Sequence, residues 1–418
     1  MSRQIAGVRG VSALLPKDAA IWAAVEDRAR TLFGAYGFQE IRLPVLEHTE
    51  LYTRAVGAVT DIVEKEMYTF SDRNGESLSL RPEGTAGCVR AGIEAGLFHN
   101  QTQRLWYQGP MFRHERPQKG RYRQFHQLGV EAYGMAGPDI EAELILLGER
   151  LMRSLGVKTR LLVNSLGTAE CRVRYREALV GYLAAHESAL DEDSRRRLTR
   201  NPLRVLDSKN PEMAEVLAGA PRIGDHLNEE AAAHFAGLTG RLAELGVSFE
   251  VTPRLVRGLD YYTHTVFEWV ADDLGAQATV CAGGRYDGLV AELGGAATAA
   301  VGFALGLERL ISLVTQTPRL PVLDVFLMVP AALNGQALYL AESLRDQGLA
   351  VEVHLAGASQ KSQMKRAQLS GARCIVQAQD EGVVLAGGAD RHERVVPWID
   401  AAMRIINALG AETKYHDR

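Results

Sequence analysis

The sequence is poor in cysteine and contains no long hydrophobic run. Its four cysteines, at positions 88, 171, 281 and 374 of 418, lie more than 80 residues apart. Neither a CxxC metal site nor a disulfide framework is therefore indicated. No stretch approaches the ~20 apolar residues of a membrane-spanning helix. The first ten residues also lack the apolar core of a signal peptide. These absences predict a cytoplasmic protein that does not enter a membrane.

An excess of either charge is also missing. The 47 Lys and Arg residues are balanced by 51 Asp and Glu residues, which leaves a net charge of −4. This balance excludes a general basic coat for nucleic acid, so a polyanion would have to be bound by local patches. The phosphate-binding pattern GxxxxGK[ST] is absent, and no GxGxxG follows a strand pattern and opens a helix. A nucleotide would therefore have to be held by side chains presented from a sheet.

The first block of the chain predicts a sheet with flanking helices. With 46% hydrophobic and 23% charged residues the chain is typical of a globular protein, and its length indicates two or three domains. A helix pattern begins near Pro16 and ends at Gly37. Pro44 lies inside the next strand pattern, which should form an edge or an interface because proline cannot donate to a sheet. Further patterns cover residues 41–45, 67–70, 78–81, 105–112 and 124–133 as strands and 139–155 as a helix. Strands joined by hairpins predict a largely antiparallel α+β fold.

The pattern of expected helices and strands changes twice in the later part of the chain. Residues from about 167 to 250 are helical in pattern and rich in charge, which indicates a helical insertion between two halves of one sheet. Strand patterns resume over residues 255–270, 278–282 and 300–305, before a helix that begins at Leu307. A linker with two prolines in seven residues, 315–321, then precedes alternating strands and helices. This alternation predicts a small α/β domain with a mainly parallel sheet.

The most basic stretch lies between two strand patterns. Residues 113–123 include five Lys or Arg residues and one Glu, a local charge of +4. The flanking strands make this segment a hairpin with a long basic loop, and Tyr122 and Phe125 offer flat faces on which a base could stack. A solvated turn is the alternative. The mixture of arginines, aromatic residues and a turn with proline and glycine favours a nucleotide or nucleic-acid site.

Two later segments combine charge, aromatic rings and glycine. Arg257 is followed by a glycine, which would let backbone and ligand approach closely. Tyr261 and Tyr262 come next in a strand-like stretch, where neighbouring side chains point to opposite faces, so only one should line a given pocket. A buried structural network is an equal alternative. Gly283 and Gly284 at a strand end permit either a bulge or a close wall for a ligand.

Two helix starts also carry polar groups. Glu83 and Thr85 could bind an ammonium group, although they could equally cap the helix that follows. Arg309 could face a phosphate, although an exposed charge is the commoner outcome at such a place. The histidines, such as His114 and His126, do not have the spacing of metal ligands, and we interpret them as structural or loop residues.

In their order along the chain, these segments resemble the histidyl-tRNA synthetases, a family of class II aminoacyl-tRNA synthetases. Residues 80–85 are similar to that family's amino-acid loop, and residues 112–127 are similar to its motif 2. Residues 257–267 and 282–289 are similar to the two signatures peculiar to the histidine enzymes, and residues 302–310 are similar to motif 3. The strand that contains Pro44 resembles motif 1, the dimer-forming element. The resemblance covers nearly the whole chain.

The resemblance implies both fold and activity. It implies a class II catalytic domain over residues 1–316, with the insertion at about 167–250, and an anticodon-binding α/β domain over 322–418. The implied reaction is the ATP-dependent ligation of L-histidine to the histidine tRNA through a histidyl-adenylate, with release of AMP and pyrophosphate. ATP is then a substrate, Mg²⁺ bridges its phosphates, and the protein is a homodimer.

The resemblance also assigns roles at the ATP side of the site. Arg113 and Arg257 would hold the α-phosphate from opposite sides, and these two are the expected catalytic residues. Arg121 and Arg309 would hold the outer phosphates, and Phe125 would stack on adenine. Arginine suits these roles because its planar fork binds two phosphate oxygens and stays charged.

On the histidine side, the resemblance implies a binding set that includes Arg257. Glu131 and Tyr262 are expected at the two ring nitrogens of the substrate, each of which needs a partner. Glu83 and Thr85 would bind the α-ammonium group. The whole expected set is Glu83, Gly84, Thr85, Gln127, Glu131, Arg257, Tyr261, Tyr262, Gly283 and Gly284.

Two other functions compete with this interpretation. One is a non-catalytic, histidine-binding regulatory subunit of ATP phosphoribosyltransferase, which shares the catalytic-domain fold. Such a subunit should lack the C-terminal domain and the ATP-binding arginines, whereas this chain keeps Arg113, Arg121, Arg257 and Arg309. The other is a stand-alone RNA-binding module, which leaves the histidine-specific segments unexplained.

Overall fold

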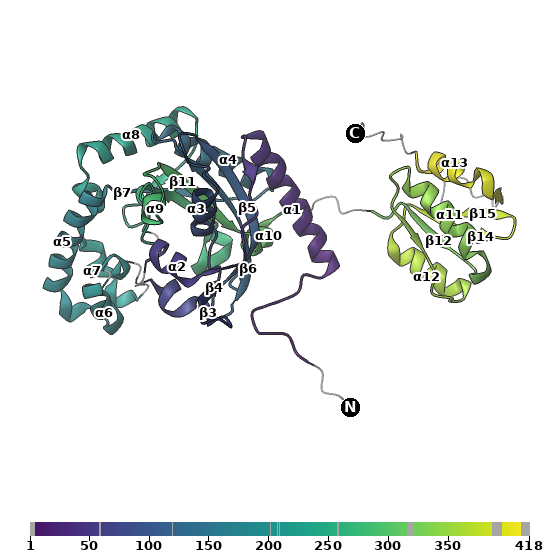
Figure 1. Ribbon diagram of the computed structural model, residues 1–418, viewed down its shortest axis with the longest axis horizontal. Helices are drawn as coiled ribbons and strands as arrows, with labels where there is room; N and C mark the ends of the chain where they lie inside the picture. Colours follow the sequence, from purple (N-terminus) through teal and green to yellow (C-terminus); the bar gives the residue numbers. More distant parts are fainter. Residues whose placement is uncertain are drawn as a thin grey trace. The chain divides into compact units, whose positions relative to one another are not determined.

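A computed structural model describes residues 5–57, 60–118, 120–200, 202–206, 208, 210–256, 259–315, 322–386 and 395–410. The chain divides into two compact units, Met1–Pro318 and Arg319–Arg418 (Figure 1). No helix within the described residues is long and apolar enough to cross a membrane.

An eight-stranded sheet forms the centre of the larger unit. Its strand order is β1-β5-β6-β11-β10-β9-β7-β8, and every neighbouring pair is antiparallel except the two outermost pairs. The largely antiparallel α+β fold expected from the sequence is confirmed. The strands are β1 (Gln39–Glu40), β5 (Gln103–Phe112), β6 (Gln124–Tyr133), β7 (Arg160–Gly167), β8 (Glu250–Val251), β9 (Thr263–Val270), β10 (Thr279–Arg285) and β11 (Ala300–Gly306).

Helices cover both faces of this sheet because successive strand residues point to opposite sides. On β5, Trp106 packs with one hydrophobic cluster, whereas Leu105 and Tyr107 pack with the other. The first cluster includes residues of α1 (Pro16–Ala35), α4 (Asp139–Ser154), α8 (Glu229–Glu244) and α10 (Leu307–Leu313). The second includes residues of α2 (Thr49–Ala55), α3 (Thr85–Glu94), α5 (Ala169–Ala185) and α9 (Leu289–Glu292).

The helical insertion follows the edge of the sheet. It runs from α5 through α6 (Glu192–Arg200) and α7 (Ala214–Gly219) to α8. Figure 1 shows α5, α6 and α7, in teal, gathered at one end of the larger unit beside β7. Strand β7 leads into the insertion and has no counterpart among the expected strands. Residues 161–163 are all apolar, so the alternation of polar and apolar residues that indicates a strand is not visible there.

Two expected strands are wrong. Residues 41–45 do not form one strand around Pro44, because they connect β1 to β2 (Leu46–His48). Strand β2 lies in a separate three-stranded sheet with β4 (Ser77–Leu80) and β3 (Tyr68–Ser71). The carbonyls of Leu43 and Pro44 instead accept hydrogen bonds from the buried Arg81 guanidinium, at 2.9 and 3.2 Å. The strand expected from residue 255 begins only at Thr263, because residues 259–262 form a turn.

The smaller unit has one five-stranded sheet, ordered β13-β12-β14-β15-β16. Strands β13 (Val351–Val353), β12 (Val325–Met328) and β14 (Cys374–Gln379) are parallel, as expected, and β15 (Gly382–Ala386) and β16 (Val396–Pro397) are antiparallel. Helices α11 (Asn334–Arg345), α12 (Gln360–Ser370) and α13 (Trp398–Leu409) complete it. Ser359 caps α12 by accepting the backbone N–H of Ser362, and Gly371 ends the helix with φ 68°. The linker expected at 315–321 lies almost wholly outside the described residues.

Candidate active site

A cavity of about 190 Å³ lies in the larger unit, between the sheet, the start of α3 and the loop that joins β5 to β6. It brings together ten of the residues expected at the site: Glu83, Thr85, Arg113, Arg121, Phe125, Gln127, Glu131, Tyr261, Tyr262 and Arg309. Gly84, Gly283 and Gly284 are not among its lining residues. Arg257, the expected catalytic arginine, lies outside the described residues.

One end of the cavity is built around the buried carboxylate of Glu131 on β6. Thr85 Oγ1 and Tyr107 OH both donate to Glu131 Oε1, at 2.8 and 3.1 Å, and Tyr286 OH donates to Oε2. Burial raises the pKa of Glu131 to about 8, although the hydroxyl donors oppose this shift. Glu131 is therefore held by three hydroxyl groups at the border of a cavity, and its burial favours the protonated form.

Glu83 borders the same end and also fixes α3. Its carboxylate accepts the backbone N–H groups of Thr85 and Ala86, both at 2.8 Å. The N-cap residue of α3 is Gly84 and has no side-chain cap, but Glu83 just before it satisfies two N–H groups of the first turn and still lines the cavity. Burial raises the pKa of Glu83, and the two backbone donors oppose that shift. A cationic group in the cavity would stabilise the ionised form.

Both tyrosines of the turn at 259–262 line the cavity, which corrects the expectation that only one could do so. That expectation assumed a strand, whereas Tyr261 and Tyr262 lie before β9 begins. Their ring centroids are 4.7 Å apart, and the ring of Tyr286 lies 5.5 Å from that of Tyr261. Three aromatic rings thus surround the space next to Glu131.

Sequence reasoning missed Tyr107 and Tyr286 as site residues. Tyr286 lies in the glycine-rich segment that had been singled out, but its hydroxyl reaches Glu131 only through the folded sheet. Tyr107 fits because glycines stand on both sides of its ring. A Cβ atom on Gly84 or on Gly129 would lie only 2.1 Å from that ring. Neither glycine by itself identifies Tyr107 in the sequence, because a glycine can equally mark a bulge or a turn.

The glycines of β10 and β11 permit close packing inside the sheet. A Cβ atom on Gly302 would lie 1.7 Å from Glu131 Oε2, so any side chain there would displace the carboxylate. A Cβ atom on Gly283 would lie 2.1 Å from the Gly302 carbonyl oxygen, and one on Gly284 would lie 2.4 Å from the Thr265 carbonyl oxygen. That Gly283 and Gly284 also leave room for a substrate ring stays a prediction.

The other end of the cavity is basic, and Arg113 is fixed there by two contacts. Its Nε donates to the Pro82 carbonyl at 2.8 Å, and its guanidinium carbon lies 5.2 Å from the centroid of the Phe125 ring. Arg113 stands at the base of the basic hairpin, where its backbone N–H donates to the Arg123 carbonyl at 2.9 Å. The hairpin with a long basic loop, expected from the sequence, joins β5 to β6.

Arg309 and Arg121 face the same end from different elements. Arg309, on α10, donates to the carbonyls of Gly120 and Thr279 at 3.0 and 2.8 Å, and Arg121 lies 3.2 Å from Glu115. Burial lowers the pKa of Arg309, and the charges of the neighbouring arginines lower it further. Cations gathered at a partly buried surface repel one another, so an anion bound between them would be stabilised.

His126 has a structural contact beside this end of the cavity. The Glu308 carboxylate accepts the backbone N–H of His126 and lies 3.0 Å from its Nδ1, which ties β6 to α10. Among the described residues, no group of three or more His, Cys, Asp and Glu side chains could hold a metal ion.

An antiparallel sheet that carries a cavity with an acidic end and an arginine-lined end defines a class II aminoacyl-tRNA synthetase fold. A family model described as histidyl-tRNA synthetase matches residues 10–310. The chain belongs to the histidyl-tRNA synthetase family.

Solved structures agree with this assignment. The apo histidyl-tRNA synthetase of S. aureus is 33% identical, with a TM-score of 0.78, over 96% of this chain and 100% of that one. A protein from Bacillus halodurans, described as an ATP phosphoribosyltransferase regulatory subunit/histidyl-tRNA synthetase, is 24% identical over 90% of this chain and 99% of its own, with a TM-score of 0.66. The histidyl-tRNA synthetase of Nostoc sp. PCC 7120 is 19% identical over 97% of this chain and 100% of its own, with a TM-score of 0.68. The last two likenesses show the fold alone.

Proposed function

We propose that this protein ligates L-histidine to the histidine tRNA in two steps. In the first, a carboxylate oxygen of histidine attacks the α-phosphorus of ATP, and the bond to the β-phosphate oxygen breaks, which gives histidyl-adenylate and pyrophosphate. In the second, a hydroxyl of the terminal tRNA ribose attacks the activated carbonyl, and AMP leaves. Both nucleophiles belong to substrates, so the protein supplies alignment and charge stabilisation.

One observation supports this proposal most strongly. A single cavity joins the buried Glu131 carboxylate, with its hydroxyl donors and aromatic rings, to an end lined by Arg113, Arg121 and Arg309. An amino acid with a polar ring fits the first end, and a polyphosphate fits the second. Their reacting groups would then meet between the two ends.

At the amino-acid end, Glu131 would accept a ring N–H of histidine, and Tyr262 would serve the other nitrogen. Tyr261 adjoins them, and the hydroxyls that hold Glu131 would fix its direction. Glu83 and Thr85 would bind the α-ammonium group, with Gln127 nearby at the main-chain end. A competitor without ring nitrogens would bury the Glu131 carboxylate without the ring N–H donor that the site is built to accept, and a site of this kind rejects such a competitor by roughly 10⁴–10⁵.

At the nucleotide end, Arg113 would hold the α-phosphate, since the Pro82 carbonyl and the Phe125 ring already fix its guanidinium. The same Phe125 ring would stack on adenine. Arg121 and Arg309 would bind the outer phosphates, which relieves the repulsion among the arginines. By family resemblance Arg257 completes the α-phosphate site.

Mg²⁺ would enter with ATP. Mg²⁺ keeps several waters and commonly binds substrate phosphates plus one or two carboxylates rather than an all-protein cage. Glu115 and Glu308 line the cavity together with Arg121 and Arg309, and these carboxylates would fit this mode. The ion would neutralise phosphate charge, and the arginines would orient the phosphates.

The smaller unit would bind the anticodon end of the tRNA. We assign catalysis to residues 1–316 and anticodon binding to residues 322–418, whose helix α12 presents Lys361 and Lys365 to solvent. A homodimer and a cytoplasmic location complete the proposal, as the family resemblance implies.

A non-catalytic regulatory subunit is the second candidate, because the fold of the Bacillus halodurans protein is shared by this chain. The arginine-lined end of the cavity favours the enzyme, since a subunit that only binds histidine has no need of Arg113, Arg121 and Arg309 there.

Exchange of radioactive pyrophosphate into ATP tests the proposal, with each of the twenty amino acids supplied in turn. We expect L-histidine to support exchange and the other amino acids to support very little. Charging of histidine tRNA, measured in parallel, should follow. A protein that binds histidine but catalyses neither exchange nor charging would establish the regulatory function instead.

A further inference from the structure

A side chain of the helical insertion holds the turn that carries two tyrosines of the cavity. Arg172, in the first turns of α5, donates from its NH1 group to the carbonyl of Asp260 at 3.2 Å and to that of Tyr262 at 2.9 Å. Arg172 does not line the cavity. Its contacts are with the backbone of the turn, behind the faces that Tyr261 and Tyr262 present to the cavity.

The opposite side of the turn is also fixed. The backbone N–H of Asp260 donates to the Val56 carbonyl at 3.3 Å. At Gly57, whose φ is +99°, a Cβ atom would lie 2.5 Å from Asp260 Oδ2. The turn is therefore held both by the residues that follow α2 and by the guanidinium of Arg172.

Arg172 suits this task because it is partly buried and stays charged. Burial lowers its pKa, and the negative charges of Asp260 and Glu292 oppose that shift. A charged donor forms stronger hydrogen bonds to carbonyls than a neutral one. One guanidinium group that binds two carbonyls fixes the peptide plane before Tyr261 and the peptide plane after Tyr262, and so constrains the backbone that carries both tyrosine rings.

We propose that Arg172 is a positioning residue for the amino-acid end of the cavity. It holds the turn at 259–262 in the conformation in which Tyr261 and Tyr262 both face the bound amino acid. The inference rests on the proposed function, because its measured effect is on histidine use. It also gives the helical insertion a role in substrate binding, since α5 carries the residue.

The test compares three variants of the full-length protein in pyrophosphate exchange, with histidine and ATP varied separately. Arg172→Met removes both hydrogen bonds and keeps an apolar stem, so the KM for histidine should rise at least about tenfold. The KM for ATP should stay within about twofold, because Arg113 and Arg309 are held by contacts outside this turn. Arg172→Lys retains a charged donor and should recover part of the loss.

The matched control is Arg176→Met, which removes an exposed arginine one turn further along the same helix. It should behave as wild type. Thermal unfolding of each variant separates positioning from a general loss of structure, since a purely structural role would lower the melting temperature and affect both substrates equally. The Arg172→Lys variant is measured in the same way, so a poorly folded methionine variant does not end the test.

The outcomes are separable. If wild type shows no histidine-dependent exchange, the proposed function fails, whatever the variants do. If wild type is active and Arg172→Met resembles Arg176→Met, or raises both KM values alike, Arg172 has no positioning role. Only a selective rise in the KM for histidine, partly reversed in Arg172→Lys, supports the proposal.

Discussion

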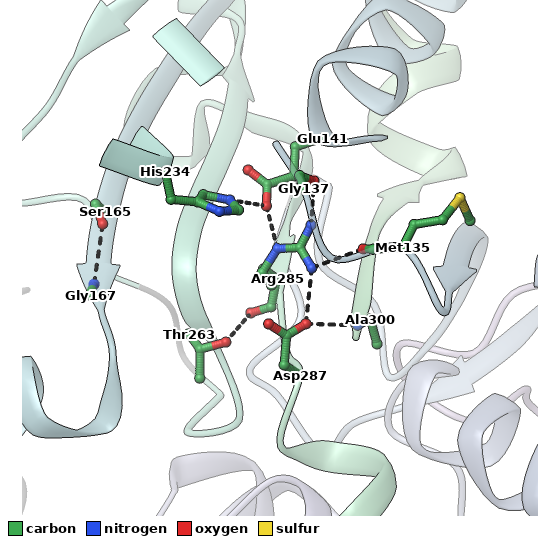
Figure 2. Close-up of polar contacts among 10 residues, drawn as sticks. All are labelled: Met135, Gly137, Glu141, Ser165, Gly167, His234, Thr263, Arg285, Asp287 and Ala300. Atoms are coloured by element: carbon green, nitrogen blue, oxygen red, sulfur yellow. Dashed lines mark hydrogen bonds and ion pairs between the residues drawn. The ribbon is translucent and has the colours of Figure 1, made fainter. Parts of the chain in front are cut away.

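Arg285 on β10 and Glu141 on α4 form an ion pair in which neither side chain is exposed to solvent. Figure 2 shows the hydrogen bonds and ion pairs that the Arg285 guanidinium makes. Besides Glu141, it donates to the carbonyls of Met135 at 3.1 Å and Gly137 at 2.9 Å, and it pairs with Asp287 at 3.0 Å. A buried charge with this many partners ties residues 135–141 to the end of β10.

The pair also connects the insertion to the cavity. His234, on α8, lies 2.8 Å from Glu141 through its Nε2. Burial alone would raise the pKa of Glu141, but the hydrogen bond with His234 and the charge of Arg285 outweigh it and lower the pKa. The residue after Arg285 is Tyr286, whose hydroxyl reaches Glu131. The buried pair therefore anchors the strand end that presents Tyr286 to the cavity.

Arg285→Met should destabilise the protein strongly. Removal of Arg285 leaves the buried Glu141 carboxylate with His234 but without its arginine partner, and breaking a buried pair in this way typically costs about 3–5 kcal/mol. The double variant Arg285→Met with Glu141→Met removes both charges and should regain much of that loss. Urea unfolding of the three proteins measures this. Equal destabilisation in the single and double variants would show that the lost charge pairing is not the cause.

Glu131 should make stability fall as pH rises. Its pKa in the folded protein is raised from 4.5 to about 8 by burial, so the folded state holds a proton that the unfolded state releases. This contribution is fully present below the unfolded value and is lost as pH rises through the folded one. The melting temperature of wild type relative to Glu131→Gln should therefore decrease between about pH 5 and pH 8. Parallel curves for the two proteins would contradict the shift.

Gly302→Ala should damage histidine binding. The added methyl group would lie 1.7 Å from Glu131 Oε2 and 2.6 Å from the Val130 carbonyl, so the carboxylate has to move away from Tyr286. Overpacking of this kind costs about 1–3 kcal/mol. The KM for histidine and the melting temperature report it. Gly288→Ala is the control, because a Cβ atom there meets nothing within 4 Å. Identical behaviour of the two variants would mean that the sheet yields at Gly302 without disturbing Glu131.

Arg257→Ala should slow adenylate formation by about 10²–10³, the loss expected for one preorganised donor to a developing charge. Arg257→Lys keeps the charge but loses the planar fork, so it should rescue only part of the rate. Single-turnover formation of adenylate measures the effect. A rate within a few-fold of wild type would remove Arg257 from the reaction.

Reversal of charge at Lys361 and Lys365 should weaken tRNA binding without affecting chemistry. Both are exposed on α12 of the smaller unit. Loss of two phosphate contacts should make the slope of log binding constant against log salt concentration less steep by roughly 1–2. Filter binding at several salt concentrations gives that slope. Pyrophosphate exchange serves as the control and should not change. Unaltered tRNA affinity would place the anticodon site elsewhere.

The sequence by itself determined the features that depend on neighbouring residues. The basic hairpin between β5 and β6 follows from two strand patterns and a turn, and the parallel part of the smaller sheet follows from the alternation of strand and helix patterns after residue 321. Local periodicity and turn chemistry act over a few residues, so the sequence displays them directly. The residues that line the cavity were found by their resemblance to a family, not by such patterns.

Only the tertiary structure decided how distant groups meet. Glu131 acquires its raised pKa and its three hydroxyl partners from strands and a helix far apart in sequence, so no local pattern could name Tyr107 and Tyr286. Tyr261 and Tyr262 share one cavity because Arg172 and the end of α2 hold a turn where the pattern suggested a strand. The physical reason is the same in each case. Hydrogen bonds and burial between distant segments depend on register and packing, which exist only once the chain has folded.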